Sequence, residues 1–353
     1  MKEKVLAALS GGVDSAVAAL LLKNEGYTVS GITMKLCDSL PDGDDIGIPN
    51  TDILDAKSIC DTLAIPHTAI SLCESFRKCV IESFVDEYKT GGTPNPCVEC
   101  NRTIKFGKLL EVAKQMGCDK LATGHYARVE RDENGHYLLK KAVDESKDQS
   151  YFLWMLTENE LKHVLFPLGG MTKTEIRNIA ARNGFVNAHK SDSQDICFIE
   201  DGDYASFIEK HTGEVFPRGN FVDTEGNILG EHSGIIHYTV GQRKGLGIAL
   251  GKPVFVRSKD AESNTVTLCD DAELYSKTLT ASRARFSEAF DLEEPRRLSA
   301  KIRYRHAPAL ATVEKTSPST FTLTFDEPQR AAAKGQSVVL YDGDTVIGGG
   351  IID

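Results

Sequence analysis

A chain of 353 residues is long for one domain, so two or three domains are expected. Its 41% hydrophobic and 26% charged residues are typical of a soluble globular protein, and no apolar run approaches the roughly 18 residues of a membrane span. The formal charge of −10 excludes indiscriminate nucleic-acid binding but permits a local basic surface. Met1–Lys4 is charged and leads directly into an apolar run, which is unlike a signal peptide. We therefore expect a cytoplasmic protein, without membrane partners, whose nine cysteines are free, metal-bound or redox-active.

The stretch Val5–Ser15, VLAALSGGVDS, predicts a phosphate-binding turn. An apolar run that reads as a buried strand is followed by two glycines, and helix-like periodicity begins at Val17. Glycines let backbone N–H groups approach an anion, and a helix N-terminus adds positive charge. The serines can donate hydroxyl groups, and Asp14 can hold magnesium against phosphates. An ordinary strand–turn–helix corner is the alternative, but the full SGGVDS string favours a phosphate site.

The string is not a Walker A loop, because the pattern GxxxxGK[ST] is absent from the chain. It resembles the PP-loop of the ATP-pyrophosphatases, which split ATP into AMP and pyrophosphate and adenylate an oxygen of their substrate. The lysine that usually marks a phosphate loop is missing from the string itself. The resemblance therefore implies activation of an acceptor rather than phosphoryl transfer.

Alternating strand and helix patterns follow and predict a doubly wound parallel α/β sheet. The expected strands are Thr28–Thr33, Ile65–Ile70 and Lys120–Thr123. The expected helices are Asp52–Leu63, Ser75–Tyr88 and Ile104–Met116, with a loop over Ser39–Asn50. Further along, Tyr126–Glu130 and His136–Lys141 read as a hairpin, Lys147–Leu153 as the start of a helix, and Asn159–Asn183 as helical with a break at Pro167–Gly170.

Two stretches carry the cysteines of interest. In Gly91–Phe106, GGTPNPCVECNRTIKF, the prolines predict an extended rigid loop that presents Cys97 and Cys100 at CxxC spacing. That spacing permits redox, zinc or iron–sulfur roles. In Ser191–Glu200, Cys197 taken alone reads as a buried apolar cysteine.

The second half of the chain changes in texture. From Asp203 onward it is rich in turns and short strands, and Gly241–Gly251 either passes a phosphate backbone or is a simple connection. Strand-like segments then predict a small β-barrel: Leu298–Arg305, Ala311–Lys315, Thr320–Phe325, Ser337–Tyr341 and Val346–Ile352. Arg296–Arg305 holds five basic residues and no acid, and reads equally as an RNA-backbone surface or a solvated strand face.

In order and spacing, these elements closely resemble the bacterial tRNA-specific 2-thiouridylases. The resemblance rests on SGGVDS, TPNPCVECN, TGHYAR and SQDICFI, and extends through YTVGQRKGLGI, KIRYR and the C-terminal GQSVVLYDGDTVIGGGII. It implies a PP-loop catalytic domain over residues 1–208, with 160–185 packing near the next domain. It also implies a central adaptor domain over 209–272 and a tRNA-binding barrel over 273–353.

The same resemblance implies the chemistry. Enzymes of this family adenylate the C2 oxygen of the wobble uridine, at tRNA position 34, and replace it with sulfur. Cys197 matches the persulfide carrier, and Cys100 matches the nucleophile that attacks it. The ATP site is implied at Ala8, Leu9, Ser10, Gly11, Gly12, Val13, Asp14, Ser15, Met34 and Gly124. Contacts to the tRNA are implied at Asn95, Pro96, Cys97, His125, Lys147, Asp148, Gln149, Arg303, Tyr304 and Gln336.

The implied cofactors are ATP and Mg²⁺, the latter at Asp14. The implied partners are tRNA, with lysine, glutamate and glutamine acceptors, and a cysteine desulfurase or sulfur-relay protein. One position departs from the family, because many members carry aspartate where this chain has Cys97. Three thiolates at Cys97, Cys100 and Cys197 permit a [4Fe–4S] cluster, although we favour the persulfide relay.

Two other classes of function compete with this hypothesis. A PP-loop synthetase that makes a small metabolite would share SGGVDS but would not need the cysteine stretch or the barrel. A non-catalytic RNA-binding protein would be expected to lose Asp14 or the cysteines, which are present.

Overall fold

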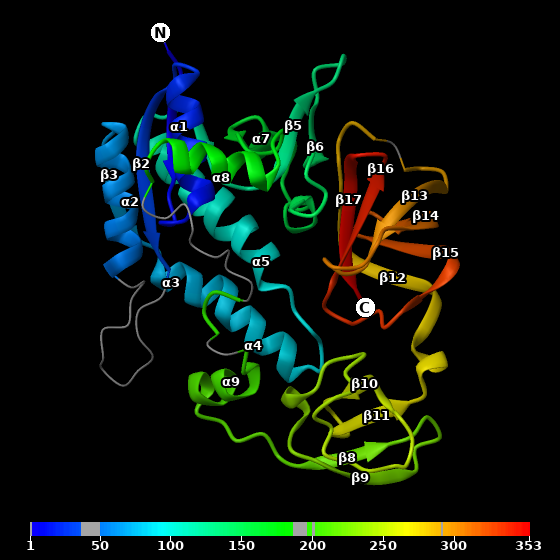
Figure 1. Ribbon diagram of the computed structural model, residues 1–353. Coiled ribbons are helices and arrows are strands. Elements are labelled where there is room, and N and C mark those ends of the chain that lie inside the picture. Colours follow the sequence, from blue (N-terminus) through cyan, green and yellow to red (C-terminus); the bar gives the residue numbers. More distant parts are fainter. Residues whose placement is uncertain (1, 37–49, 186–195, 200–201, 291) are drawn as a thin grey trace.

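The computed structural model describes residues 2–36, 50–185, 196–199, 202–290 and 292–353. Figure 1 shows three parts: an α/β domain at the N-terminus, a small sheet domain below it, and a β-barrel at the C-terminus. The predicted loop Ser39–Asn50 lies almost wholly outside the described residues, as do Cys37 and most of Ser191–Glu200.

The N-terminal sheet has five parallel strands in the order β3-β2-β1-β4-β7. They are β1 (Lys4–Ala8), β2 (Thr28–Lys35), β3 (His67–Ser71), β4 (Lys120–Ala122) and β7 (Val164–Leu165). Val5 and Leu6 of β1 are fully buried, because this central strand is covered on both faces. The apolar run that predicted a buried strand is thus the middle of the sheet.

Helices cover both faces of this sheet, as successive residues of β1 reveal. Val5 packs in one core cluster with α1 (Val13–Asn24), α2 (Asn50–Leu63) and α8 (Lys173–Arg182). Leu6 packs in another, with α6 (Leu109–Gln115) and part of the barrel. Successive strand residues point to opposite faces. The predicted doubly wound α/β fold is therefore confirmed.

The remaining helical segments are short. They are α3 (Cys73–Phe76), η1 (Arg77–Ile81), α4 (Glu82–Lys89), α5 (Pro96–Glu99), η2 (Cys100–Lys108), η3 (Ser150–Phe152), α7 (Glu158–Leu161), α9 (Tyr204–Thr212), η4 (Ile235–His237) and η5 (Asp271–Leu274).

Two helix predictions were wrong. Lys147–Leu153 forms a turn and the single 3-10 turn η3 instead of a longer helix. Asn159–Asn183 is divided among α7, β7 and α8. Two capping boxes, Thr157–Glu160 and Thr172–Glu175, start separate helices, and the residues between them gain backbone hydrogen bonds by pairing with β4.

The central sheet has the strand order β10-β11-β8-β9. Its strands are β8 (Gly219–Val222), β9 (Ile228–His232), β10 (Phe255–Asp260) and β11 (Thr265–Cys269).

The C-terminal strands form the predicted barrel, which the pairing of β12 with β17 closes. They are β12 (Tyr275–Phe286), β13 (Arg296–Lys301), β14 (Ala309–Ser317), β15 (Thr320–Arg330), β16 (Ser337–Asp342) and β17 (Thr345–Ile352). The strand predicted to end at Arg305 ends at Lys301 instead. The predicted hairpin, β5 (Ala127–Arg131) with β6 (Tyr137–Lys141), extends the barrel sheet through the pair Lys140–Thr345. A hairpin from the N-terminal part of the chain therefore continues the sheet of the C-terminal barrel and joins the two domains.

Within the described part of the chain, none of the helices is long and apolar enough to cross a membrane.

Candidate functional site

The glycine turn between β1 and α1 has the geometry of an anion cradle. Gly11 has φ +71°, a conformation that favours glycine, and Gly12 is the N-cap of α1. A Cβ added at Gly124, which follows β4, would lie 2.9 Å from the backbone nitrogen of Ser15. The glycine therefore lets the end of β4 pack directly on the first turn of α1. The proposed ATP residues from Ala8 to Ser15 and Gly124 thus meet at one edge of the sheet, where parallel α/β folds bind ligands.

Asp14 is held by two residues from distant elements. Lys173, the first residue of α8, places its Nζ 2.8 Å from each carboxylate oxygen of Asp14. The hydroxyl of Tyr126 donates to Oδ1 at 2.8 Å. Lys173 is buried. SGGVDS contains no cation, and the fold places one beside Asp14 from a residue 159 positions later in the chain. Lys173 was not identified in the sequence analysis. Its sequence signal was the capping box that starts α8.

The remaining proposed ATP residue, Met34, lies near the carboxyl end of β2. It is half-buried and packs against two of the core clusters. Met34 pairs with Ile70 of β3, and on the other side of β2 the N–H of Leu9, just before the glycine turn, donates to the carbonyl of Ile32 at 2.8 Å. Met34 therefore belongs to the same sheet edge as the glycine turn.

The cysteine stretch is helical from Pro96 onward, and only residues 92–95 before it lack regular secondary structure, so the prediction of an extended loop at Cys97 and Cys100 was wrong. Asn95 is the N-cap of α5 and Pro96 its first residue, a position where proline's missing N–H costs nothing and its fixed φ suits a helix. Cys97 lies in α5 with an exposed side chain, and Cys100 begins the π-helix η2 and is 7% exposed. The two thiols therefore sit on consecutive helical turns.

Cys197 joins these two cysteines from a separate segment. Its residue is exposed, so the interpretation as a buried apolar cysteine was wrong. The next residue, Phe198, takes the apolar position instead: its ring centroid lies 5.7 Å from that of Phe76, 5.4 Å from Phe84 and 5.2 Å from Phe207. The aromatic cluster thus anchors the backbone beside Cys197.

Cys97, Cys100 and Cys197 act on one another and share one charged neighbour, Lys105, as the causes of their pKa shifts indicate. Surrounding protein raises the pKa of all three, that of Cys100 to about 12. The thiols of Cys197 and Cys97 raise the pKa of Cys100 further, while the ammonium of Lys105 lowers the pKa of each. Among the described residues, Lys105 is therefore the cation common to Cys97, Cys100 and Cys197, which we call the cysteine centre. This lysine was not identified in the sequence analysis.

The three cysteines and Asp14 differ in how well they suit a metal. Among the residues that the structure describes, no three Cys, His, Asp or Glu side chains are arranged to hold a metal ion. The arrangement of Cys97, Cys100 and Cys197 therefore does not fit a [4Fe–4S] cluster. Asp14 fits magnesium better, because Mg²⁺ bound to a nucleotide commonly takes one or two protein carboxylates plus phosphate oxygens.

The segment before Cys97 is clamped by both β domains. Gln336 donates from Nε2 to the carbonyls of Thr93, at 2.9 Å, and Pro94, at 3.2 Å. Lys259 of the central sheet donates from Nζ to the carbonyl of Gly92 at 3.0 Å. The cysteine stretch therefore lies where all three domains meet.

Other residues implied in tRNA binding have structural contacts. His125 is buried, and desolvation, followed by the charge of Lys105, lowers its pKa well below the usual value. The carboxylate of Asp148 accepts from the N–H groups of Ala142, at 3.0 Å, and Ser150, at 3.2 Å. Gln149 accepts from the N–H of Tyr126 at 2.9 Å. These contacts order the turn that carries Lys147.

The basic stretch of the barrel is largely paired within the protein. Arg296 pairs with Asp342 at 3.0 Å, and Arg297 pairs with Asp326 at 2.5 Å. Arg303 donates to the carbonyls of Val240, at 2.9 Å, and Ala331, at 2.7 Å. These three side chains therefore hold the barrel together or join it to the central domain.

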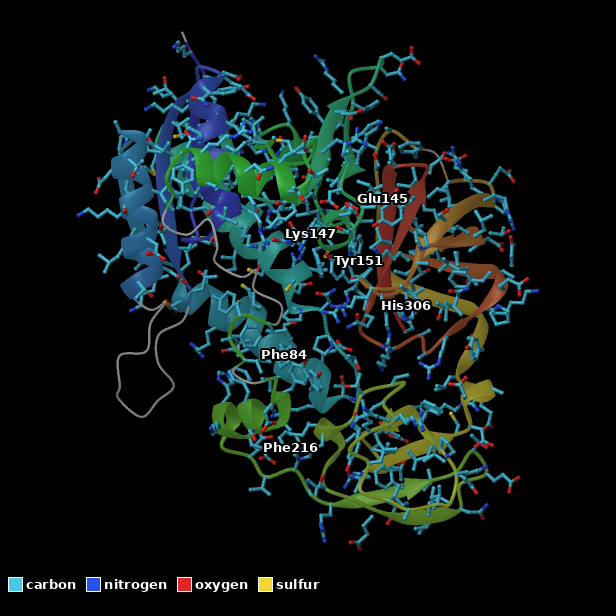
Figure 2. All side chains as sticks on the ribbon, viewed as in Figure 1. Phe84, Glu145, Lys147, Tyr151, Phe216 and His306 are labelled. Carbon is cyan, nitrogen blue, oxygen red and sulfur yellow. The ribbon has the colours of Figure 1, made fainter. Side chains whose placement is uncertain are left out.

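Tyr304 of the barrel packs against aromatic residues of the α/β domain. Its ring is 4.4 Å from that of Phe152 and 6.1 Å from that of Tyr151, and Lys301 lies 5.3 Å from its centroid. In Figure 2, Lys147, Tyr151 and His306 follow one another along the region where the α/β domain faces the barrel. Aromatic and basic side chains thus meet along the border of the two domains.

The fold and its cradle define the class: a PP-loop nucleotide-binding domain followed by two β domains. Family models agree, since one described as "tRNA methyl transferase HUP domain" matches residues 3–201. A "tRNA methyl transferase PRC-barrel domain" model matches 205–270, and an "Aminomethyltransferase beta-barrel domain" model matches 276–352.

Full-length relatives identify the family. The "tRNA-specific 2-thiouridylase MnmA" of Clostridioides difficile (strain 630) is 48% identical over 359 residues, which cover 100% of this chain and 99% of that protein. The protein of the same name from Acetivibrio thermocellus is 50% identical over 358 residues, covering 99% of each. The chain belongs to the tRNA-specific 2-thiouridylase family. A distant fold likeness, with a TM-score of 0.34 and 18% identity, exists to a 4-thiouridine synthetase solved with RNA and ATP; it covers 55% of this chain and 44% of that one.

Proposed function

We propose that this protein is an ATP-dependent tRNA sulfurtransferase that converts the wobble uridine, at tRNA position 34, to 2-thiouridine. The observation that carries the proposal is the meeting of Cys197 with Cys97 and Cys100, from separate segments, around one lysine. Family membership supports the same reaction, because the full-length relatives are named for it.

Activation of the uridine is assigned to the PP-loop edge of the sheet. Backbone N–H groups of the turn, the hydroxyls of Ser10 and Ser15, and the ammonium of Lys173 are the groups suited to hold the triphosphate of ATP. Asp14 is the carboxylate suited to magnesium. The C2 oxygen of the uridine attacks the α-phosphorus, pyrophosphate leaves, and the oxygen becomes part of a good leaving group, AMP.

Sulfur transfer is assigned to the cysteines. The terminal sulfur of a persulfide on Cys197 attacks C2 of the activated uridine and AMP leaves, which joins the base to Cys197 through a disulfide. The thiolate of Cys100 then attacks the sulfur of Cys197. A Cys100–Cys197 disulfide forms, the electron pair of the broken bond goes to the sulfur on the base, and 2-thiouridine is released. A dithiol reductant returns both cysteines to thiols.

The pKa of Cys100 is the reason why this site needs electrostatic help. A thiol with a pKa of about 12 is almost fully protonated at neutral pH, and only the thiolate is an effective nucleophile. By the family resemblance, Cys97 stands where many members carry aspartate, and we assign it a supporting role. The partners are tRNAs for lysine, glutamate and glutamine, and a cysteine desulfurase or relay protein that loads Cys197, in the cytoplasm.

Nucleoside mass spectrometry tests the proposal. The protein is incubated with unmodified tRNA, ATP, magnesium and a persulfide donor, and the digested tRNA is examined for 2-thiouridine. Formation that requires ATP and Cys197 supports the proposal. Absence of 2-thiouridine together with ATP cleavage on a small amine or acid would instead favour a PP-loop synthetase.

A further inference from the structure

Lys105 occupies a special place relative to Cys100 because the segment between them is a π-helix. In η2 the backbone bonds run from residue i to residue i+5, as the bond from the N–H of Leu109 to the carbonyl of Ile104 shows. Residues five apart are therefore about one turn apart along the helix. In an α-helix, five residues would turn about 140° beyond one full turn, toward another face. The π-helix thus keeps Lys105 on the same side of the segment as Cys100, and such helices are frequent at functional sites.

His125 fixes the ammonium of Lys105 from the other side. Nζ of Lys105 lies 3.5 Å from Nε2 of His125, and Nδ1 of His125 lies 2.6 Å from the hydroxyl of Thr123. An ammonium group can only donate, so Nε2 accepts and Nδ1 carries the proton. The rings of Phe106 and Phe166, 5.6 Å and 5.8 Å away, enclose the imidazole in apolar surroundings. A buried neutral histidine therefore holds this lysine in place without competing for its charge.

Within the part of the chain that the structure describes, Lys105 is the cation that acts on all three cysteines, Cys97, Cys100 and Cys197. It favours the ionised form of Cys97, Cys100 and Cys197 alike, against the desolvation that opposes all three. A nearby charged pair on this helical segment, Arg102 and Glu99, lies 2.7 Å apart and is largely self-compensating.

We propose that Lys105 is the fixed counter-charge of the sulfur-transfer centre, held by His125, and that it stabilises whichever of the three cysteines is the thiolate at each stage. Ionisation releases the thiol proton to water, and the negative sulfur remains beside the ammonium. The proposal deepens the proposed function and rests on it. Lys105 does not react with the substrate in this proposal; it acts on the reaction by stabilising the thiolates.

The test measures each thiol directly and needs neither ATP nor tRNA. Full-length protein is alkylated with iodoacetamide over a range of pH, and the rate at each cysteine is read by peptide mass spectrometry. In Lys105→Met, alkylation of Cys97 and Cys197 at about pH 8 should slow by roughly threefold to tenfold, and their profiles should move to higher pH. Lys105→Arg should restore most of the rate.

Two controls separate charge from structure. Lys108→Met removes an exposed lysine of the same helix, which pairs with Glu111 at 3.2 Å, and should leave all rates unchanged. Cys118, whose pKa is raised by burial and by Asp119 and lowered by Lys4, without a contribution from Lys105, serves as the internal standard in every variant. If buried Cys60 reacts faster relative to Cys118 in Lys105→Met, the fold has loosened, and Lys105→Gln, which can still donate to His125, decides in its place.

Equal alkylation profiles in the wild type and in a folded neutral variant would overturn the proposal. So would a loss that Lys105→Arg does not repair. Because the readout is thiol ionisation, a normal Lys105 effect with no 2-thiouridine would discredit the proposed function alone. An absent Lys105 effect in a protein that still makes 2-thiouridine would discredit this inference alone.

Discussion

The ammonium of Lys173 lies 2.8 Å from both carboxylate oxygens of Asp14, although the two residues are 159 positions apart in the chain. The pair joins the first turn of α1 to the first turn of α8, at the glycine turn. A carboxylate and a cation at a phosphate cradle serve different partners: the cation suits the phosphate oxygens and the carboxylate suits magnesium. We therefore expect the Asp14–Lys173 ion pair to open when nucleotide binds, so that Lys173 contacts phosphate oxygens and Asp14 binds magnesium.

Asp14→Ala should abolish pyrophosphate release, because the cradle loses its magnesium-holding carboxylate. It should also destabilise the protein by on the order of 1–3 kcal/mol, since Lys173 stays buried while Asp14 is partly exposed. Labelled pyrophosphate in the presence of tRNA and thermal unfolding measure the two effects. Asp14→Ala combined with Lys173→Met should regain stability but not activity. Undiminished pyrophosphate release would remove Asp14 from the mechanism.

The three cysteines should differ in their importance. We expect Cys100→Ala and Cys197→Ala to form no 2-thiouridine, because each contributes one sulfur to the proposed disulfide, and Cys97→Ala to retain partial activity. All three should still release pyrophosphate with tRNA. Iron analysis of anaerobically purified protein accompanies the assay. A fully inactive Cys97→Ala together with about four irons per chain would show that a cluster is required.

The rate of sulfur transfer should rise with pH. The surroundings of Cys100 raise its pKa to about 12, so below that pH the thiolate fraction grows about tenfold per pH unit. Single-turnover formation of 2-thiouridine by protein loaded with persulfide should therefore increase steadily from about pH 6.5 to about pH 9, if this step limits the rate. A profile that is flat over this range would mean that Cys100 is already ionised when tRNA is bound.

Phe198→Ala should impair sulfur transfer more than activation. The ring of Phe198 packs against Phe76, Phe84 and Phe207, and its loss releases the segment that carries Cys197. We expect 2-thiouridine formation to fall at least tenfold while pyrophosphate release stays near normal. Phe207→Leu is the matched control, because it thins the same cluster while the ring of Phe198, next to Cys197, stays in place. Equal effects of both variants would reduce Phe198 to an ordinary core residue.

The barrel should contribute to tRNA binding through Tyr304 and to stability through Arg303. Arg303 donates to two backbone carbonyls, so Arg303→Ala should lower the melting temperature. Tyr304→Ala should weaken tRNA binding with little change in ATP binding, and the double variant should also flatten the salt dependence of binding slightly. Binding titrations at several salt concentrations measure this. An unchanged affinity and salt slope would leave the Arg296–Arg305 stretch as a structural strand.

Much of this protein could be predicted from local patterns. The buried strand β1, its glycine turn and the helix after it follow from residues within about twenty positions of one another. The β-barrel follows from alternating strands and turns. The resemblance carried by the cysteine and glycine motifs identified the family that the full-length relatives confirm. These features are recorded locally, in periodicity and turn residues, even where the strands that pair, such as β12 and β17, are far apart in the chain.

Predictions from a few neighbouring residues alone were wrong at the cysteines of the candidate site. The prolines before Cys97 predicted an extended loop, yet Pro96 takes the first position of a helix, where its missing N–H costs nothing and its fixed φ suits the helix. Cys197 between two apolar residues predicted burial, yet Phe198 fills the aromatic cluster and leaves the cysteine exposed. At Cys197, neighbouring residues compete for one buried position, and tertiary packing decides that Phe198 takes it.

The sequence by itself determined the phosphate turn, the cysteine pair and the order of the domains. Only the tertiary structure decided that Lys173 neutralises Asp14, that Lys105 is the cation shared by three thiols, and that Gln336 clamps the segment before Cys97. The physical reason is that a charge acts over a few ångströms in space, whatever the separation along the chain. Which charges come within that range is set by how the sheet, the π-helix and the barrel pack together.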